Sequence, residues 1–438
     1  MQESLIGFAA LLFLIFGRVP LAVAMGVVGV VGFALVQTIQ FENPRGWDAA
    51  LNMVSQVAFE TGLNYGLSVV PLFILMGNLI TESGISTQLY RASNAFLGHR
   101  KGGLALATVV SCGAFSAVCG SSMATAATMA KVAMPPMREY KYSDGLASGS
   151  IAAGGTLGIL IPPSVILVVY GLISETNIGA LFMAGLLPGL IGIILYMAAV
   201  TVTVTLYPHL GPAGVRSTWA ERFDAFKNVW TIALLFVIVM GGIYLGVFTP
   251  TEAAGIGASG AFFLALLRRR LTFKGLVNSL VGAARTTAML FILVIGAEMF
   301  SNFINLAGMP GALRDMVVGM GLSPAAVIVG ILVIYLLLGC VLESMSMVLL
   351  TVPVFYPLVQ ALGFDLVWFG IVVVVVTEIS LITPPVGMNV FVLRTVLPDV
   401  PLKTIFKGVT PFWIADIVRL ILITSIPALS LFLPKLIG

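Results

Sequence analysis

Charged residues are scarce in this 438-residue sequence: Asp, Glu, Lys and Arg together make up only 9% of it. A soluble domain carries about 25% of these residues. Hydrophobic residues account for 59% of the chain, and the mean hydropathy is +1.10. The chain therefore has too little polar surface to face water on all sides, and lipid must be its solvent. This composition predicts a polytopic membrane protein and argues against an ordinary soluble enzyme.

Histidine and cysteine are also rare. His99 and His209 lie too far apart in the sequence to suggest a metal site, and the three cysteines have no metal-ligand spacing. We interpret the cysteines as reduced packing residues, and we expect no cofactor. There is no His-Glu-x-x-His pair and no Gly-x-Ser-x-Gly with a plausible base, which argues against an intramembrane enzyme. The net charge is only +4 and aromatic residues do not interleave with the basic clusters, so nucleic acid is excluded as a partner.

Long apolar runs, by contrast, are frequent. A membrane span needs about 20 apolar residues. The first run has no basic n-region and no small-residue cleavage motif, so we interpret it as a span and not as a cleaved signal. We predict spans near residues 3–17, 20–38, 65–82, 146–171, 179–206, 229–248, 252–267, 287–306, 364–393 and 410–433.

Two further apolar stretches are interrupted by short polar segments. The stretch 103–137 is broken at 116–122, and the stretch 322–360 is broken at 339–344. Each is long enough for two half-spans joined by a polar tip. We predict that both form re-entrant helical hairpins.

Basic residues on both sides of the first hairpin indicate the topology, because positive charge marks the cytoplasmic side. Counting spans onward puts both flanks of the second hairpin outside, although Arg314 counts against this. Both termini are then expected in the periplasm, in a multi-pass protein of the bacterial inner membrane. The basic residues at the first hairpin are Arg91, His99, Arg100, Lys101, Lys131, Arg138 and Lys141.

The sequence repeats itself at an offset of 222 to 224 residues. Each half, 1–219 and 220–438, then holds five spans and one hairpin. Since five is odd, the two halves should have opposite orientations, which is typical of secondary transporters. The alternative is an old duplication without transport function. The matched pairs are Asn78 and Asn302, Gly84 and Gly308, Ser122 and Ser344, Pro135 and Pro357, Pro162 and Pro384, Gly185 and Gly408, and Pro188 and Pro411.

Two segments that precede later spans, 49–64 and 271–285, also correspond in the repeat. The second alternates basic residues with leucines and Phe273. This pattern suits an amphipathic helix that lies in the membrane plane. Such horizontal arms could brace a fixed scaffold, and ordinary interfacial connectors are the alternative.

Four backbone breaks at membrane depth mark the expected site: the two hairpin tips and the pairs Pro162-Pro163 and Pro384-Pro385. Backbone groups left unpaired in lipid are costly, so a break persists only where an ion, a ligand or a cavity satisfies them. Freed carbonyls and Ser/Thr hydroxyls are hard oxygen ligands that suit Na⁺. Helix N-termini after each break present N–H groups to an anion. We expect each tip to meet the broken span of its own half.

These breaks predict two pseudo-symmetric Na⁺ sites, with a substrate site between the tips. The first Na⁺ site is expected at Ser121, Ser122, Thr156, Gly158 and Pro162. The second is expected at Ser344, Thr377, Thr383, Pro384 and Gly387. The candidate substrate contacts are Ser122, Thr125, Ser164, Glu343 and Asn389.

Structural interpretations of the same residues remain open. Serines in membrane helices often only allow close packing, and Pro-Pro pairs can be simple kinks. Glu343 is an acid at membrane depth, where acids are usually functional, but it could instead cap the second half of its hairpin. Glu378 aligns with Thr156 in the repeat and is either an ion or proton group or a helix-packing hydrogen bond.

At these positions the chain resembles the large membrane subunit, of DctM or SiaM type, of tripartite ATP-independent periplasmic (TRAP) transporters. The resemblance covers essentially the whole chain. It departs from the expected pattern at Glu343, where Asp is anticipated. Glutamate has the same charge as aspartate, but its extra methylene shifts the position that the carboxylate reaches. The motifs that carry it are Gly120-Ser121-Ser122-Met123-Ala124-Thr125, Gly158-Ile159-Leu160-Ile161-Pro162-Pro163-Ser164, Leu342-Glu343-Ser344-Met345-Ser346 and Ile382-Thr383-Pro384-Pro385-Val386-Gly387-Met388-Asn389.

The resemblance implies Na⁺-driven uptake of an organic acid such as a C4-dicarboxylate, sialic acid or a sugar acid. It also implies an elevator-type fold, a small four-span membrane subunit and a periplasmic substrate-binding protein. The alternative is a related carboxylate/ion symporter that needs no binding protein. A pore is not favoured, because no filter repeat occurs.

Overall fold

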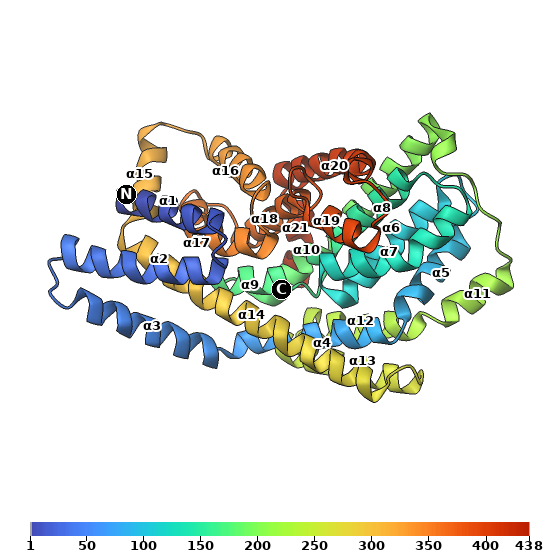
Figure 1. Ribbon diagram of the computed structural model, residues 1–438, viewed down its shortest axis with the longest axis horizontal. Helices are drawn as coiled ribbons and strands as arrows, with labels where there is room; N and C mark the ends of the chain where they lie inside the picture. The colour runs from blue at the N-terminus through green and yellow to red at the C-terminus, as the bar shows by residue number, and fades with distance from the viewer. Residues whose placement is uncertain (1, 438) are drawn as a thin grey trace.

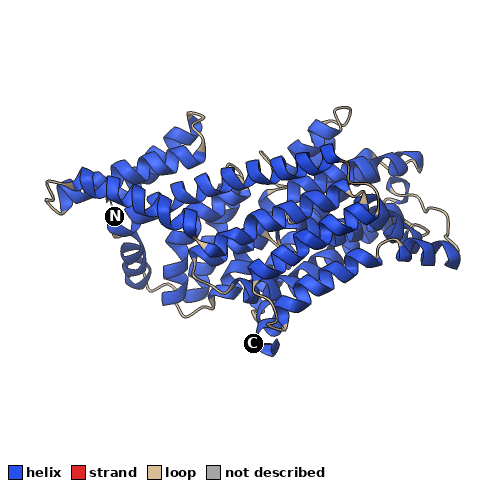
Figure 2. Cartoon of the chain, turned by 90° about the horizontal axis from the view of Figure 1, so that it is seen from below, coloured by secondary structure: helices blue, strands red, loops and turns tan. Residues whose placement is uncertain are grey.

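The computed structural model describes residues 2–437, and these residues form helices and loops without a strand (Figures 1 and 2). Within this range six helices are long and apolar enough to cross a membrane, or up to eight if each of two bent helix pairs forms one span. The prediction of an all-α polytopic membrane protein is confirmed.

The first half of the chain alternates long helices with short ones. The chain between α2 and α3 continues α2 as a π-helical turn, Val36–Gln40, and a 3₁₀ turn, Tyr65–Ser68, precedes α4. The helices are α1 (Gln2–Phe16), α2 (Leu21–Leu35), α3 (Gly46–Leu63), α4 (Val69–Glu82), α5 (Ile85–Leu97), α6 (Gly103–Cys119), α7 (Ser122–Glu139), α8 (Asp144–Thr156), α9 (Val165–Ile173) and α10 (Ile178–Leu206).

The second half follows after the loop that ends at residue 218. Its helices are α11 (Trp219–Lys227), α12 (Trp230–Tyr244), α13 (Pro250–Leu267), α14 (Phe273–Leu306), α15 (Met309–Gly319), α16 (Pro324–Gly339), α17 (Ser344–Ala361), α18 (Leu366–Ser380), α19 (Met388–Val396), α20 (Leu402–Ser425) and α21 (Ala428–Ile437).

Helix ends follow from local sequence at matched places in both halves. Gly84 and Gly308, with φ of 71° and 72°, precede α5 and α15, where only glycine enters the left-handed region freely. Neither helix is among the spans predicted from the sequence, because both are shorter than the about 20 residues that a span needs. Thr218 and Thr249 form capping boxes with the glutamates three positions on, which fixes the starts of α11 and α13.

Both predicted hairpins are present as helix pairs. α6 packs against α7, and α16 packs against α17. Both predicted broken spans are also present: α8 and α9 are separated at residues 157–164, and α18 and α19 are separated at 381–387. Both Pro-Pro bonds, Pro162-Pro163 and Pro384-Pro385, are cis. That the hairpins re-enter the membrane, that the halves are inverted and that the division falls at residue 219 stay predictions.

Two boundary predictions were wrong. The segment 271–285 is no separate arm, because it continues into the next predicted span as the 34-residue helix α14. No proline interrupts this stretch, and its glycines are tolerated inside a long helix. The predicted span 410–433 is instead α20 and α21, which bend by 55°. The predicted span 229–248 agrees with α12, which follows α11 at a bend of 47°.

Most of the helices belong to one of two groups. The α14 layer consists of α2, α3, α4, α12, α13 and α14; α14 packs against α2, α3 and α4, and α13 packs against α4 and α12. Figure 1 shows this layer along one long side of the molecule. The hairpin body consists of α6 to α10 and α16 to α20. Each hairpin also packs against the broken span of the other half, since α7 contacts α19 and α17 contacts α9.

Candidate functional site

A cavity of about 250 Å³ lies where the two hairpin tips approach each other. Ser121 and Ser122 from the first tip and Glu343 and Ser344 from the second line it. The α14 layer closes it on the other side through Asn78 and neighbouring side chains. The further lining residues are Ile74, Cys119, Gly120, Met123, Ala124, Ile159, Val165, Ile166, Thr286, Leu290, Met345, Leu381 and Met388.

The first tip rests on the break of its own half. Gly120 has a φ of 64°, and a Cβ there would lie 2.8 Å from the Pro163 carbonyl oxygen. A Cβ on Gly158 would lie 2.9 Å from the carbonyl group of Ser121. A side chain at either position would collide with the backbone opposite, so both glycines are required for the first tip to lie this close to the break at residues 157–164.

The second tip repeats this arrangement. The Cys340 thiol donates to the Pro384 carbonyl oxygen at 3.6 Å, and Gly339 packs directly against Ser380. The expectation that each tip meets the broken span of its own half is confirmed.

Of the residues expected at the first Na⁺ site, Ser121, Ser122 and Gly158 gather at the tip. Ser121 is the N-cap of α7 and accepts from the Ala124 N–H at 3.4 Å. Pro162 is buried nearby, in the break itself. The Thr156 hydroxyl does not face the tip, because it donates to the Ala153 carbonyl and meets the Tyr196 hydroxyl at 3.0 Å.

Of the residues expected at the second Na⁺ site, Ser344 lies at the wall of the cavity and the other four lie outside its lining. Ser344 is 3% exposed, and its hydroxyl has no hydrogen-bond partner among the described residues. The Thr377 hydroxyl donates to the Val373 carbonyl at 2.7 Å, and the Thr383 hydroxyl accepts from Trp413 Nε1 at 3.0 Å. Gly387, with a φ of 53°, is the N-cap of α19, two positions after the Pro384-Pro385 pair.

The candidate substrate contacts divide into two groups. Ser122 and Glu343 line the cavity, whereas Thr125, Ser164 and Asn389 are fully buried outside its lining. Ser164 caps α9 by accepting from the Leu167 N–H. Asn389 Nδ2 donates to the Ala152 carbonyl of α8 at 3.0 Å.

Glu343 also has the structural role that the sequence left open. It is the N-cap of α17, and its Oε2 accepts from the Ser346 N–H at 3.3 Å and from the Ser346 hydroxyl at 3.2 Å. The carboxylate therefore caps a helix and faces the cavity at the same time.

A buried ionic cluster was missed in part by sequence reasoning. Glu378 forms an ion pair with Arg419, and Arg419 also bonds Asp416 at 2.7 Å. All three side chains are 0% exposed. The available signal was an acid and a base three positions apart inside an apolar span, which is costly in lipid unless paired.

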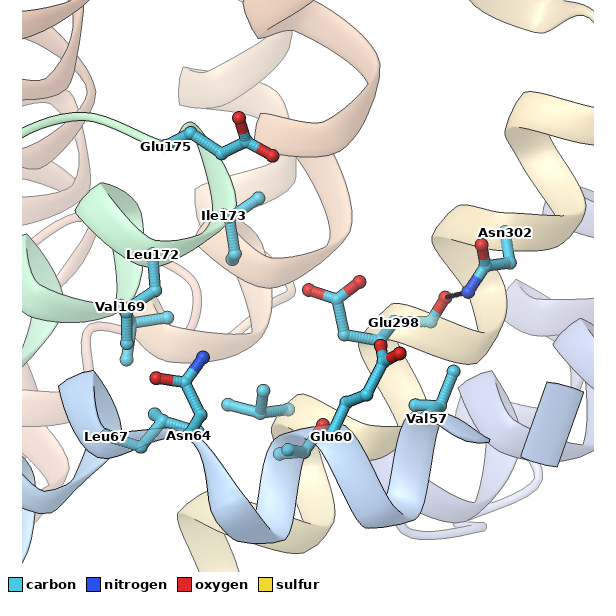
Figure 3. A pocket seen from close by; sticks show the side chains of 12 residues that line it. Val57, Glu60, Asn64, Leu67, Val169, Leu172, Ile173, Glu175, Glu298 and Asn302 are labelled. Atoms are coloured by element: carbon cyan, nitrogen blue, oxygen red, sulfur yellow. Dashed lines mark hydrogen bonds between the residues drawn. The ribbon is translucent and has the colours of Figure 1, made fainter. Parts of the chain in front are cut away.

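A second cavity, of about 360 Å³, lies between α3, α9 and α14 (Figure 3). Glu60, Glu175 and Glu298 reach it from three different segments, beside Asn64 and Asn302. Among the described residues, however, no three acidic, histidine or cysteine side chains are arranged so that they could hold a metal ion.

Residues 8–429 match the family model described as tripartite ATP-independent periplasmic transporter, DctM component. The chain belongs to this family. It is thus a large TRAP permease subunit of a membrane transporter, and not an enzyme.

Characterised relatives agree with this assignment. The permease is 38% identical to the C4-dicarboxylate TRAP transporter large permease protein DctM of Pseudomonas aeruginosa, over 87% of this chain and 88% of that protein. It is 32% identical to the DctM protein of Rhodobacter capsulatus over the full length of both. It is 34% identical to the sialic acid TRAP transporter large permease protein SiaM of Vibrio cholerae, over 85% and 87% of the two chains.

The fold also resembles a solved structure, that of the YdaH transporter of Alcanivorax borkumensis. The TM-score is 0.61 at 14% identity, and the match covers 97% of this chain and 98% of that one. At this identity the likeness concerns the fold alone.

Proposed function

We propose that this permease takes up an organic acid, such as a C4-dicarboxylate, sialic acid or a sugar acid, and that Na⁺ drives the uptake. The observation that carries the proposal is the cavity of about 250 Å³ between the hairpin tips. α7 begins at this cavity behind an uncharged cap, Ser121, so its N-terminal N–H groups favour an anion there, whereas the Glu343 carboxylate already caps α17. Relatives of this permease are named for C4-dicarboxylates and for sialic acid, which are both acids.

Na⁺ is the proposed coupling ion because the tips and breaks offer hard, uncharged oxygen atoms. Ser344 has a buried hydroxyl without a partner among the described residues, at the wall of the cavity. Ser121 and Ser122 stand at the equivalent place on the first tip. The two proposed Na⁺ sites remain those at Ser121, Ser122, Thr156, Gly158 and Pro162, and at Ser344, Thr377, Thr383, Pro384 and Gly387. Thr156 would contribute its carbonyl oxygen and not its hydroxyl, which is engaged with Tyr196.

The proposed transport step is an elevator movement of the hairpin body along the α14 layer. α7 contacts both α8 and α19, and α17 contacts both α9 and α18, whereas the α14 layer meets the hairpin body mainly through α4 and α14. The partners proposed are a small four-span membrane subunit and a periplasmic substrate-binding protein, in the bacterial inner membrane. Both termini would face the periplasm.

Thermal unfolding of the purified permease in Na⁺ and in equal K⁺ tests the ion sites. A ligand that binds only the folded state stabilises it by about 1.4 kcal/mol at ten times its Kd. We expect a Na⁺-specific rise in the melting temperature that Ser122→Ala and Ser344→Ala each reduce. Gly255→Ala, on α13 where a Cβ meets nothing within 4 Å, serves as the control and should keep the full rise. Identical curves in both salts for the permease and for its complex with the small subunit would contradict the Na⁺ sites.

A further inference from the structure

The cavity of about 360 Å³ between α3, α9 and α14 collects polar side chains from separate helices (Figure 3). Glu60, Thr61 and Asn64 line it from α3, and Glu298 and Asn302 line it from α14. Residues three or four positions apart share one face of a helix. Each of these two sets therefore lies on a single helix face, and both faces are turned toward the same cavity.

The charges around this cavity are all negative. Glu175, which follows α9, joins Glu60 and Glu298 in the lining. Among the described residues that line the cavity there is no lysine, arginine or histidine. Carboxylates that share a cleft repel one another and attract cations, because the low-dielectric walls focus their field. The cavity is thus arranged to take up a positively charged group.

Thr61 adds a buried hydrogen-bonding group to this charge. It is only 7% exposed and lines the cavity, and its hydroxyl has no hydrogen-bond partner among the described residues. A helix threonine can donate to the carbonyl four positions back, as Thr81 does to Gly77 at 2.8 Å, but Thr61 makes no such bond. A polar group this buried costs free energy unless a ligand or a water molecule satisfies it.

Burial increases from one part of the cavity to the other. Glu60 and Glu175 are exposed, Glu298 is half-buried, and Thr61 is buried. A ligand would therefore enter between Glu60 and Glu175 and reach Glu298 and Thr61 with its leading end. In the predicted topology α9 ends on the periplasmic side, so this entrance would face the periplasm.

The geometry favours an organic cation over a bare metal ion. No three acidic, histidine or cysteine side chains in the described part of the chain are arranged to hold a metal ion. A guanidinium group, by contrast, presents five N–H donors in a planar fork that pairs with carboxylates through parallel hydrogen bonds. We propose that this cavity binds a guanidinium group, carried by an arginine side chain of a partner protein or by a free small molecule.

A bound guanidinium group would bridge the two groups of helices. Glu60 and Glu298 belong to the α14 layer, whereas Glu175 follows α9 of the hairpin body. Occupation of the cavity would therefore link the layer and the body between which the proposed elevator movement takes place. This consequence rests on the proposed function, but the binding itself does not.

Calorimetric titration of the purified permease with arginine amide tests the site directly. Citrulline amide is the matched compound, because it has a neutral urea group in place of the guanidinium group. We expect arginine amide to bind and citrulline amide not to bind. Glu298→Gln should weaken the binding about tenfold, since it removes a charge-assisted hydrogen bond. Glu139→Gln, exposed at the end of α7, is the control and should bind like the wild type.

Two results of this titration would overturn the proposal. One is a wild type that does not bind arginine amide, or that binds both amides equally. The other is a triple variant, Glu60→Gln, Glu175→Gln, Glu298→Gln, that binds arginine amide as the wild type does. Melting curves without ligand show that each variant is folded.

Thr61→Val separates a defined site from diffuse attraction by negative charge. The substitution removes the hydroxyl but keeps the size of the side chain and all three carboxylates. We expect it to weaken binding of arginine amide, whereas Thr201→Val, at an exposed position on α10, should not. Equal binding by Thr61→Val and the wild type would mean non-specific attraction by the acidic residues, and it would overturn the proposed site.

Binding of the two proposed partners distinguishes the sources of the guanidinium group. The affinity of the permease for the periplasmic binding protein and for the small subunit is measured separately, in the wild type and in the triple variant. If a partner supplies the arginine, its affinity falls in the triple variant and arginine amide competes with it. If both affinities stay unchanged while arginine amide binds the wild type and not the triple variant, the ligand is a free small molecule. These measurements need no Na⁺ and no organic acid, so their failure is distinguishable from failure of the proposed function.

Discussion

Asn389 at the start of α19 donates a hydrogen bond of 3.0 Å to the Ala152 carbonyl of α8, 237 residues earlier in the chain. This bond joins the two broken spans, one from each half, inside the hairpin body. At the end of the first hairpin, Arg138 pairs with Asp144 at 3.0 Å and with Asp399 after α19, and the Arg138 guanidinium lowers the pKa of the Asp399 carboxyl. These bonds tie the first hairpin and both broken spans to each other, as the proposed elevator movement of the hairpin body requires.

Gly77 is the point where the first tip contacts the α14 layer. A Cβ there would lie 2.8 Å from the Cys119 carbonyl oxygen. We expect Gly77→Ala to lower the stability of this conformation by about 1–3 kcal/mol through overpacking, and to slow uptake. Gly255→Ala, in open space on α13, should leave uptake unchanged. Wild-type uptake by Gly77→Ala would show that this contact does not limit the movement.

Glu343 combines a helix cap with a negative charge, and two substitutions separate these roles. Glu343→Ala removes both and should cost about 0.5–2 kcal/mol of stability, as loss of an N-cap does. Glu343→Ser restores the cap without the charge, so we expect near-normal stability. If the charge acts in transport, uptake by Glu343→Ser stays low, while Glu343→Asp recovers it. Full uptake by Glu343→Ser would leave capping as the only role.

Cys119 is partly exposed at the wall of the cavity, three residues before Ser122. We expect Na⁺ or substrate to change the rate at which a thiol reagent modifies it, because a ligand bound at the proposed site would shield this thiol. The labelling is done in the Cys340→Ser variant, because Cys340 is also partly exposed. Cys112 is fully buried and stays unreactive. Identical labelling rates under all conditions would argue against a tip that responds to ligands.

Arg419 pairs with two buried acids, so replacing Arg419 alone should strongly lower the stability of the permease. We expect Arg419→Met to destabilise the permease by about 3–5 kcal/mol, since it leaves uncompensated buried carboxyl groups. The triple variant Arg419→Met, Glu378→Gln, Asp416→Asn should recover much of this loss because no charge remains. Unfolding in denaturant measures both. A triple variant as unstable as the single one would mean that packing of the guanidinium against Gly192, and not its charge, stabilises the site.

The sequence identified the hairpins and broken spans because each leaves a local trace: polar residues at a tip, or two prolines in an apolar run. The repeat then paired each tip with its break, and the contacts of Gly158 with Ser121 and of Cys340 with Pro384 follow this pairing. Side-chain direction left no such trace. Thr156 and Asn389 lie beside the breaks in sequence, but helix rotation turns both into the interior. Arg419 and Asp416 were missed because one hydrophobic span was judged by its average composition.

Uptake of a labelled organic acid into proteoliposomes tests whether the permease is a Na⁺-coupled carrier. The permease would be reconstituted with its small subunit and supplied with the binding protein, under an inward Na⁺ gradient or an equal K⁺ gradient. We expect uptake in Na⁺ only, lost when the binding protein is omitted and strongly reduced by Ser122→Ala and Ser344→Ala. Uptake that is equal in both salts, or that these two variants leave unchanged, would contradict a Na⁺-coupled carrier centred on the hairpin tips.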